Sequence, residues 1–163
     1  MARRAFYSFH FDLDNWRAAQ VRSMGIVEGN VPVSDNDWEA VKRGGDVGIA
    51  RWIAGQLNGT SCTIVLIGAQ TAGRKWVIHE IIESWNQGKG VVGVYIHGLK
   101  DQSGAQSFQG QNPFSGIMIE GAPMSSIVRA YAPPFFDSQQ VYGHIRNNMA
   151  GWIEEAIAIR ARY

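Results

Sequence analysis

Two uninterrupted apolar segments constrain the fold of this 163-residue chain more strongly than any other feature. Residues 62–68 read CTIVLIG and residues 91–96 read VVGVYI, and neither segment alternates polar with apolar side chains. A strand is apolar throughout when both faces of its sheet are covered, as in parallel sheets flanked by helices. Residues 73–86, between the two segments, carry apolar side chains at helical spacing. The sequence therefore predicts a strand, a helix and a second strand at its centre.

The flanking segments extend this unit in both directions. Before this unit we expect a first strand over residues 5–11, a helix over 15–24 that Asp14 or Asn15 caps, and a loop over 25–37. A helix over 37–57 follows, which Gly44 and Gly45 divide and whose second part Asp46 caps. After the unit we expect a loop over 99–121, an edge strand over 127–132 and a closing helix over 139–162. Alternating strands and helices predict an α/β fold, namely a flavodoxin-like three-layer sandwich with a central parallel β-sheet flanked by helices. We assign residues 1–163 to a single domain, because a chain of this length forms one core.

The charge balance argues against a general nucleic-acid binder. The chain has 15 Lys and Arg residues and 14 Asp and Glu residues, so its formal net charge is +1 and it lacks the usual basic excess. No apolar run approaches the roughly 18 residues that a membrane span needs. The one cysteine, Cys62, lies within an apolar run, and a chain without an internal disulfide suits a reducing compartment. We therefore expect a soluble cytoplasmic protein with neither nucleic-acid nor membrane partners.

The helix over residues 73–86 has an unusual second face. Its expected core face consists of Val77, Ile78, Ile81, Ile82 and Trp85, and the opposite stripe consists of Trp76, Glu80, Glu83 and Gln87. Packing against the sheet does not explain a tryptophan on that stripe. One interpretation is that Trp76 walls a pocket into which Glu80 points, with Arg74 and the helix N-terminus suited to phosphate. The other is that Trp76 packs under the long loop and Glu80 is a solvated surface acid.

Two short motifs connect these segments to a known family. The first strand contains Phe6-Tyr7-Ser8-Phe9, and the helix contains Trp76-Val77-Ile78-His79-Glu80. TIR domains carry similar F-x-S-F/Y and W-x-x-x-E motifs, so the chain resembles a TIR domain. It is more similar still to the TIR-like proteins of the Thoeris antiphage system, through FYSFHF, TSCTIVLIGAQT, GRKWVIHEI, NPF and SSIVRAY in the same order.

This resemblance implies an NAD+-cleaving enzyme. Members of the family break the bond between nicotinamide and ribose, and Thoeris TIR proteins release a cyclised or otherwise modified ADP-ribose that activates a separate effector protein. The family motif implies that Glu80 is the catalytic residue. The substrate-binding residues that we expect from their positions are Ser8, Phe9, His10, Arg74 and Trp76. NAD+ is then the substrate, and we expect neither a metal ion nor a further cofactor.

The Asp12-Leu-Asp14 segment suggests a phosphatase alternative. It resembles the D-x-D-G-T motif of haloacid-dehalogenase-type phosphatases, in which the first aspartate attacks phosphate and magnesium is bound. Thr71 could serve as their second motif. However, Asn15 and Trp16 replace the usual Gly-Thr, and no acidic pair follows the later strands. The two aspartates are therefore expected to shape the chain beside the site.

Three further alternatives are a metal site, a Rossmann-type nucleotide site and a non-catalytic module. His10, Asp12 and His79 lack the spacing of metal ligands, and no glycine-rich loop follows the first strand. Many TIR domains self-associate without doing chemistry, and such a module would not need Glu80 beside Trp76.

In TIR domains a loop often completes a neighbour's active site, and residues 25–37 depart from the usual pattern of that loop. The mode of self-assembly is therefore left open.

Overall fold

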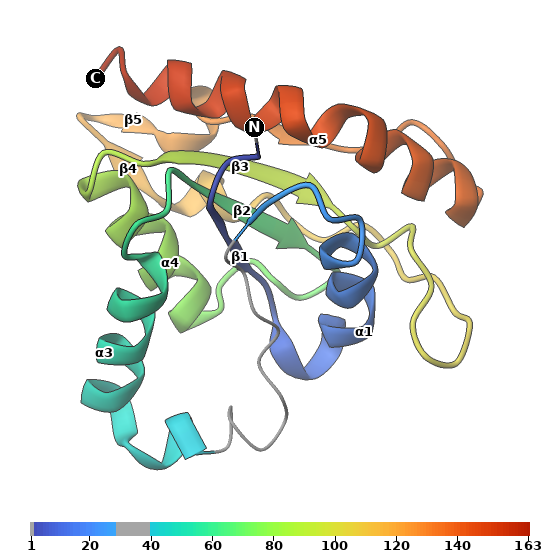
Figure 1. Ribbon diagram of the computed structural model, residues 1–163, viewed down its shortest axis with the longest axis horizontal. Helices are drawn as coiled ribbons and strands as arrows, with labels where there is room; N and C mark the ends of the chain where they lie inside the picture. The colour runs from blue at the N-terminus through green and yellow to red at the C-terminus, as the bar shows by residue number, and fades with distance from the viewer. Residues whose placement is uncertain (1, 29–39) are drawn as a thin grey trace.

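The computed structural model describes residues 2–28 and 40–163, and parallel strands form its centre (Figure 1). The strands of this sheet are β1 (Ala5–Ser8), β2 (Cys62–Ile67), β3 (Gly90–Tyr95) and β6 (Ala130–Tyr131). Their order is β1-β2-β3-β6, and each neighbouring pair is parallel. All residues of β2 and β3 are buried, as their continuous apolar sequences predict.

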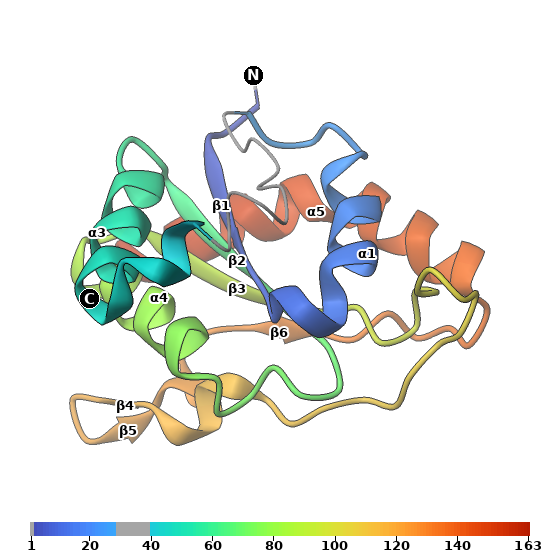
Figure 2. The same cartoon turned by 90° about the horizontal axis from the view of Figure 1, so that it is seen from below.

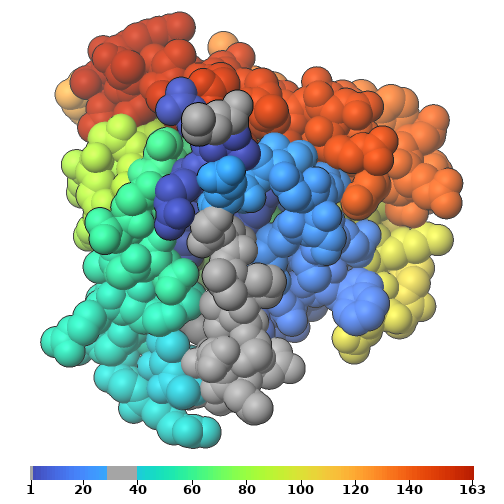
Figure 3. Space-filling model, viewed as in Figure 1, coloured from blue at the N-terminus to red at the C-terminus, as the bar shows by residue number. Residues whose placement is uncertain are grey.

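Helices cover both faces of this sheet. They are α1 (Phe11–Arg22), α3 (Gly45–Leu57), α4 (Lys75–Asn86) and α5 (Ser138–Arg160). The helices α1 and α5 pack on one face, and α3 and α4 lie on the other (Figures 1 and 2). In the space-filling view, α3 and α1 form two flanks of the molecule below α5 (Figure 3). The predicted three-layer α/β sandwich is thus confirmed. Within residues 2–28 and 40–163, no helix is both long and apolar enough to cross a membrane.

The chain leaves β1 earlier than the sequence pattern predicted. The strand ends at Ser8, and α1 already begins before the expected residue 15. His10 caps α1, because its Nδ1 accepts a hydrogen bond from the Leu13 amide at 3.3 Å. The prediction that Asp14 or Asn15 caps this helix is therefore wrong, since both residues lie inside it.

Asp14 instead forms a buried ion pair with Arg17, with 3.2 Å between Oδ1 and Nη1. Burial raises the pKa of Asp14, and the neighbouring Arg17 guanidinium opposes that shift. Arg17 also donates hydrogen bonds from Nε to the Leu99 carbonyl at 2.8 Å and from Nη2 to the Ala105 carbonyl at 2.9 Å. These bonds fasten the loop after β3 to the first turns of α1.

The helical region before β2 is divided as predicted, but its cap differs. Residues 40–43 are helical, and a turn at Gly44 separates them from α3. Gly44, which has no side chain, is the N-cap residue of α3, and Asp46 forms an ion pair with Lys75, so the predicted Asp46 cap is wrong. Most of the loop predicted over 25–37 lies outside the described residues, as does the predicted start of this helical region.

Two predictions for the C-terminal half need correction. The segment predicted as a loop over residues 99–121 contains the 3-10 helix η1 (Pro113–Gly116) and the strand β4 (Met118–Ile119). The Asn112 side chain caps η1, because its oxygen accepts a 2.9 Å hydrogen bond from the Phe114 amide. β4 pairs with β5 (Ala122–Pro123), and the 3-10 helix η2 (Met124–Ser126) follows. The predicted edge strand over 127–132 is only the short β6, because Ile127 is the C-cap of η2 and only Ala130 and Tyr131 pair with β3.

The contact between β3 and α5 generates a stability prediction. A Cβ atom at Gly90 would lie 2.7 Å from the Ile157 nitrogen and 2.8 Å from the Ala156 carbonyl carbon, so the helix backbone packs directly on the strand. Gly90→Ala should lower the free energy of unfolding by about 1–3 kcal/mol, because the backbones must move apart. Urea unfolding of the purified protein measures the difference.

Gly151→Ala on α5 is the matched control. A Cβ atom there meets nothing within 4 Å, and the residue is exposed. Alanine should therefore raise stability by about 0.5–1 kcal/mol, as it does at an unobstructed helical glycine. If Gly90→Ala is as stable as Gly151→Ala, the packing of α5 on β3 is described incorrectly.

Candidate active site

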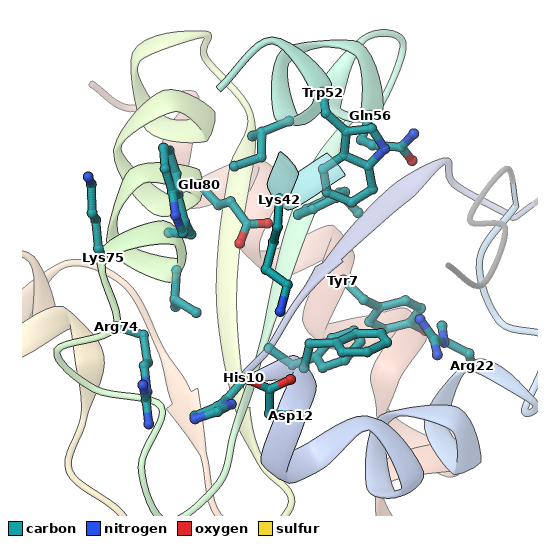
Figure 4. Close-up of a pocket in the computed structure, with 16 residues that line it drawn as sticks. Tyr7, His10, Asp12, Arg22, Lys42, Trp52, Gln56, Arg74, Lys75 and Glu80 are labelled. Carbon is teal, nitrogen blue, oxygen red and sulfur yellow. The ribbon is translucent and has the colours of Figure 1, made fainter. Parts of the chain in front are cut away.

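A cavity of about 320 Å³ lies beside β1, at one edge of the described sheet (Figure 4). Residues of β1, α1, α3 and α4 form its walls. The lining residues are Phe6, Tyr7, Phe9, His10, Phe11, Asp12, Arg22, Lys42, Trp52, Ile53, Gln56, Arg74, Lys75, Trp76, Val77 and Glu80. The cavity therefore includes the carboxyl end of a parallel strand, where α/β sheets commonly bind ligands.

Glu80 places a carboxyl group in this wall from the second turn of α4. The residue is only 7% exposed, and the Ser8 hydroxyl donates a hydrogen bond to its Oε1 at 3.2 Å. Burial raises the pKa of Glu80 well above its usual value, and the bond from Ser8 offsets this only in part. The alternative of a solvated surface acid is therefore wrong. Glu80 is a buried acid in the wall of the cavity.

Trp76 lies one turn before Glu80 and also lines the cavity. It is partly buried against a small apolar cluster made of Phe6, Ile49, Ile53 and Leu57. The Lys75 ammonium lies 5.0 Å from the centre of the Trp76 ring, and the His79 ring makes an edge contact at 5.3 Å. Trp76, which was expected to face away from the core, thus packs toward α3. The expected core face is also narrower than predicted, because Ile82 is 40% exposed.

His10 and Arg74 form a polar part of the wall. Burial lowers the pKa of His10, and the nearby Arg74 charge lowers it further, which favours a neutral imidazole. Arg74 is the N-cap residue of α4, and its guanidinium donates to the Gln70 carbonyl and side-chain oxygens, both at 3.4 Å. The Arg74 side chain makes no capping hydrogen bond, so the amides of the first turn of α4 have no acceptor from their N-cap residue.

The structure brings the predicted site residues together. The predicted residues that line the cavity are Phe9, His10, Arg74, Trp76 and Glu80. Ser8 is fully buried and reaches the site through its bond to Glu80. The Phe9 ring stacks on Phe11 with centroids 6.2 Å apart. Their roles toward a substrate remain predictions.

Other lining residues were missed by the sequence analysis. Trp52 and Gln56 come from α3, where their i, i+4 spacing beside the apolar stripe at Ile49 and Ile53 could have placed them on one face. Tyr7 and Arg22 also line the cavity, and no local pattern separates them from ordinary strand and helix residues. Contacts between segments that are far apart in the sequence bring Tyr7 and Arg22 to the cavity wall.

The phosphatase and metal alternatives gain no support from the described residues. Asp12 lines the cavity, but Asp14 is completely buried with Arg17, so the two carboxylates have different surroundings. The Thr71 hydroxyl accepts a hydrogen bond from the Gly68 amide at 2.7 Å. Among residues 2–28 and 40–163, no group of three or more His, Cys, Asp or Glu side chains could hold a metal ion.

Comparison with known proteins identifies the family. A family model described as "Thoeris protein ThsB, TIR-like domain" matches residues 6–101, which include every predicted site residue. The chain is also 39% identical over 119 residues to the Bacillus cereus (strain MSX-D12) protein named "Putative cyclic ADP-D-ribose synthase ThsB1". That match covers 70% of this chain and 62% of the relative, so the chain spans less than two thirds of that protein's length. From the family match, the chain belongs to the TIR-like domain family of the Thoeris protein ThsB.

Proposed function

We propose that this chain cleaves NAD+ between nicotinamide and ribose and converts the remaining part into a cyclic ADP-ribose signal for antiphage defence. The observation that carries the proposal is the buried Glu80 carboxyl, bonded to Ser8, in a cavity beside Trp76. The name of the Bacillus cereus relative supports the same class of reaction. A separate effector protein would receive the signal, as in other Thoeris systems.

The proposed reaction suits a carboxylate. The bond from ribose C1′ to the pyridinium nitrogen breaks, and its electron pair leaves with neutral nicotinamide, so no acid is needed for departure. The sugar becomes oxocarbenium-like, as in glycoside hydrolysis. A carboxylate at Glu80 stabilises the developing positive charge and accepts hydrogen bonds from ribose hydroxyls. The cationic nicotinamide ring favours this ionised form and so opposes the effect of burial.

Ring closure requires a second nucleophile at the same carbon. A hydroxyl oxygen or ring nitrogen of the adenosine half forms the new bond to C1′, and its proton is released if it carries one. Water at that position would give linear ADP-ribose instead. The aromatic wall formed by Phe9, Trp52 and Trp76 favours cyclisation, because it limits the access of water to the reacting carbon.

The remaining site residues have proposed roles that follow from their surroundings. Ser8 orients the Glu80 carboxyl, and Phe9 and Trp76 flank the nicotinamide and ribose. His10 and Arg74 bind hydroxyl or phosphate groups, with the N-terminus of α4 adding a partial positive charge. We propose NAD+ as substrate with no metal ion or further cofactor. Self-assembly of the chain is compatible with this scheme.

The first test is Glu80→Gln. Glutamine keeps the shape and an acceptor for Ser8 but cannot carry negative charge, so nicotinamide release should fall on the order of a hundredfold or more. Mass spectrometry of nucleotides formed from NAD+, with and without lysate of phage-infected cells, measures this. Glu83→Gln on the same helix, which does not line the cavity, is the matched control and should retain activity.

Two outcomes would overturn the assignment in different ways. Normal product formation by Glu80→Gln would remove Glu80 from the chemistry. No product from the unsubstituted chain under either condition would favour a non-catalytic interaction module.

The same substitution tests the burial of Glu80 through stability. Because the pKa of Glu80 is raised in the folded protein, its protonated form stabilises the fold below the unfolded-state pKa, and this contribution is lost as the pH rises through the folded-state pKa. Glutamine does not titrate. Relative to Glu80→Gln, the unsubstituted chain should therefore lose about 1.4 kcal/mol of unfolding free energy for each pH unit between the two pKa values.

Urea unfolding of both proteins between about pH 4 and about pH 9 measures this difference. A difference that does not change with pH would show that the carboxyl is solvated. A difference that changes in favour of the unsubstituted chain as the pH rises would show that folding lowers the pKa of Glu80, and either result would contradict the burial described here.

A further inference from the structure

The cavity has a second polar end, away from Glu80. Tyr7 of β1 and Arg22, the last residue of α1, both line it. Figure 4 shows these two side chains next to each other, with Lys42 between them and Glu80. The site therefore has an acidic end and a basic end within one cavity.

Each group at the basic end presents one buried polar atom without a hydrogen-bond partner, although the Arg22 residue as a whole is only half-buried. Tyr7 is 4% exposed, and neither its Oη nor Arg22 Nε has such a partner among residues 2–28 and 40–163. Burial raises the pKa of Tyr7, so its hydroxyl keeps its proton and remains a donor. Unpaired buried donors cost stability unless a ligand or water satisfies them. Two such donors side by side in a cavity wall indicate a binding site for an acceptor.

Other cations of the wall differ from Arg22. Arg74 donates to Gln70, and Lys75 forms an ion pair with Asp46. The Arg22 guanidinium lies over the Phe9 ring, 5.1 Å from its centre, and its Nε has no hydrogen-bond partner within the described part of the chain. No carboxylate within the described part of the chain forms a salt bridge with it.

We propose that Arg22 and Tyr7 bind a phosphate group of the ADP half of the nucleotide. This inference rests on the proposed function and adds the residues that hold the end of the substrate remote from the reacting bond. A guanidinium and a phenol hydroxyl both donate to anionic oxygens, and phosphate is the anionic part of NAD+. The cationic nicotinamide then lies toward Glu80, and the phosphate toward Arg22. The sequence had pointed to Ser8, His10, Arg74 and the start of α4 for hydroxyl or phosphate groups, and to neither Arg22 nor Tyr7.

Binding of ADP-ribose, measured by isothermal titration calorimetry, tests this proposal. All proteins carry Glu80→Gln, so that binding is observed without turnover. Adding Arg22→Gln should weaken the Kd on the order of tenfold or more, because a charge-assisted bond to phosphate is lost. Adding Tyr7→Phe should weaken it several-fold, since only a neutral donor is removed. Arg22→Lys should lie between the parent and Arg22→Gln, because it keeps the charge but loses the planar fork.

Arg51→Gln is the matched control, because Arg51 is exposed on α3 and does not line the cavity. It makes the same change in net charge and should leave the Kd unchanged. The affinity of the parent should also fall more steeply with salt than that of Arg22→Gln, since a lost ionic contact removes part of the salt dependence. A purely structural defect would not flatten this dependence.

The outcomes separate the two proposals. If Arg22→Gln binds ADP-ribose as tightly as its parent, the phosphate site is refuted while NAD+ cleavage stands on its own product analysis. If the parent binds neither ADP-ribose nor NAD+, the proposed function fails, and the phosphate site fails with it. Should Arg22→Gln not fold, Arg22→Lys and Tyr7→Phe decide by the same comparison.

Discussion

The burial of one carboxyl group, that of Glu80, is the constraint on which the site depends. A buried acid lowers the stability of a fold when it ionises, and a glutamate in the wall between β1, α3 and α4 has no structural advantage over an apolar residue. The Ser8 hydroxyl supplies one hydrogen bond and fixes the direction of the carboxyl. This arrangement is favourable once a cation binds beside it, because the ligand then stabilises the charge that burial opposes.

The geometry of β1 explains how one cavity acquires two unlike ends. Successive side chains of a strand point to opposite faces of the sheet. Tyr7 packs with the α1 and α5 layer, whereas Phe6 belongs to the cluster beneath α3, and Ser8 bonds to Glu80 on α4. Because β1 lies at one edge of the described sheet, a cavity beside it can reach both layers. A ligand that spans this edge meets Glu80 on one side and Arg22 on the other.

The sequence predicted the central sheet well because its signal is local. Continuous apolar segments identify β2 and β3, and helical spacing places Trp76 beside Glu80. The burial of Glu80 was not predictable in this way, because it depends on α3, a separate segment of the chain. Similarly, the cap at His10 replaced the expected one at Asp14, whose side chain is bound to Arg17. The position of Arg22 in the cavity wall had no sequence signal at all.

The ionisation of Glu80 itself can be measured directly. Carbon-13 NMR of glutamate-labelled protein, with the Glu80 signal assigned from its absence in Glu80→Gln, gives the pKa in the free chain and with the N-methylnicotinamide cation added. We expect a pKa clearly above the usual glutamate value in the free chain and a lower one when the cation is bound. A pKa at or below the usual value in the free chain would contradict it.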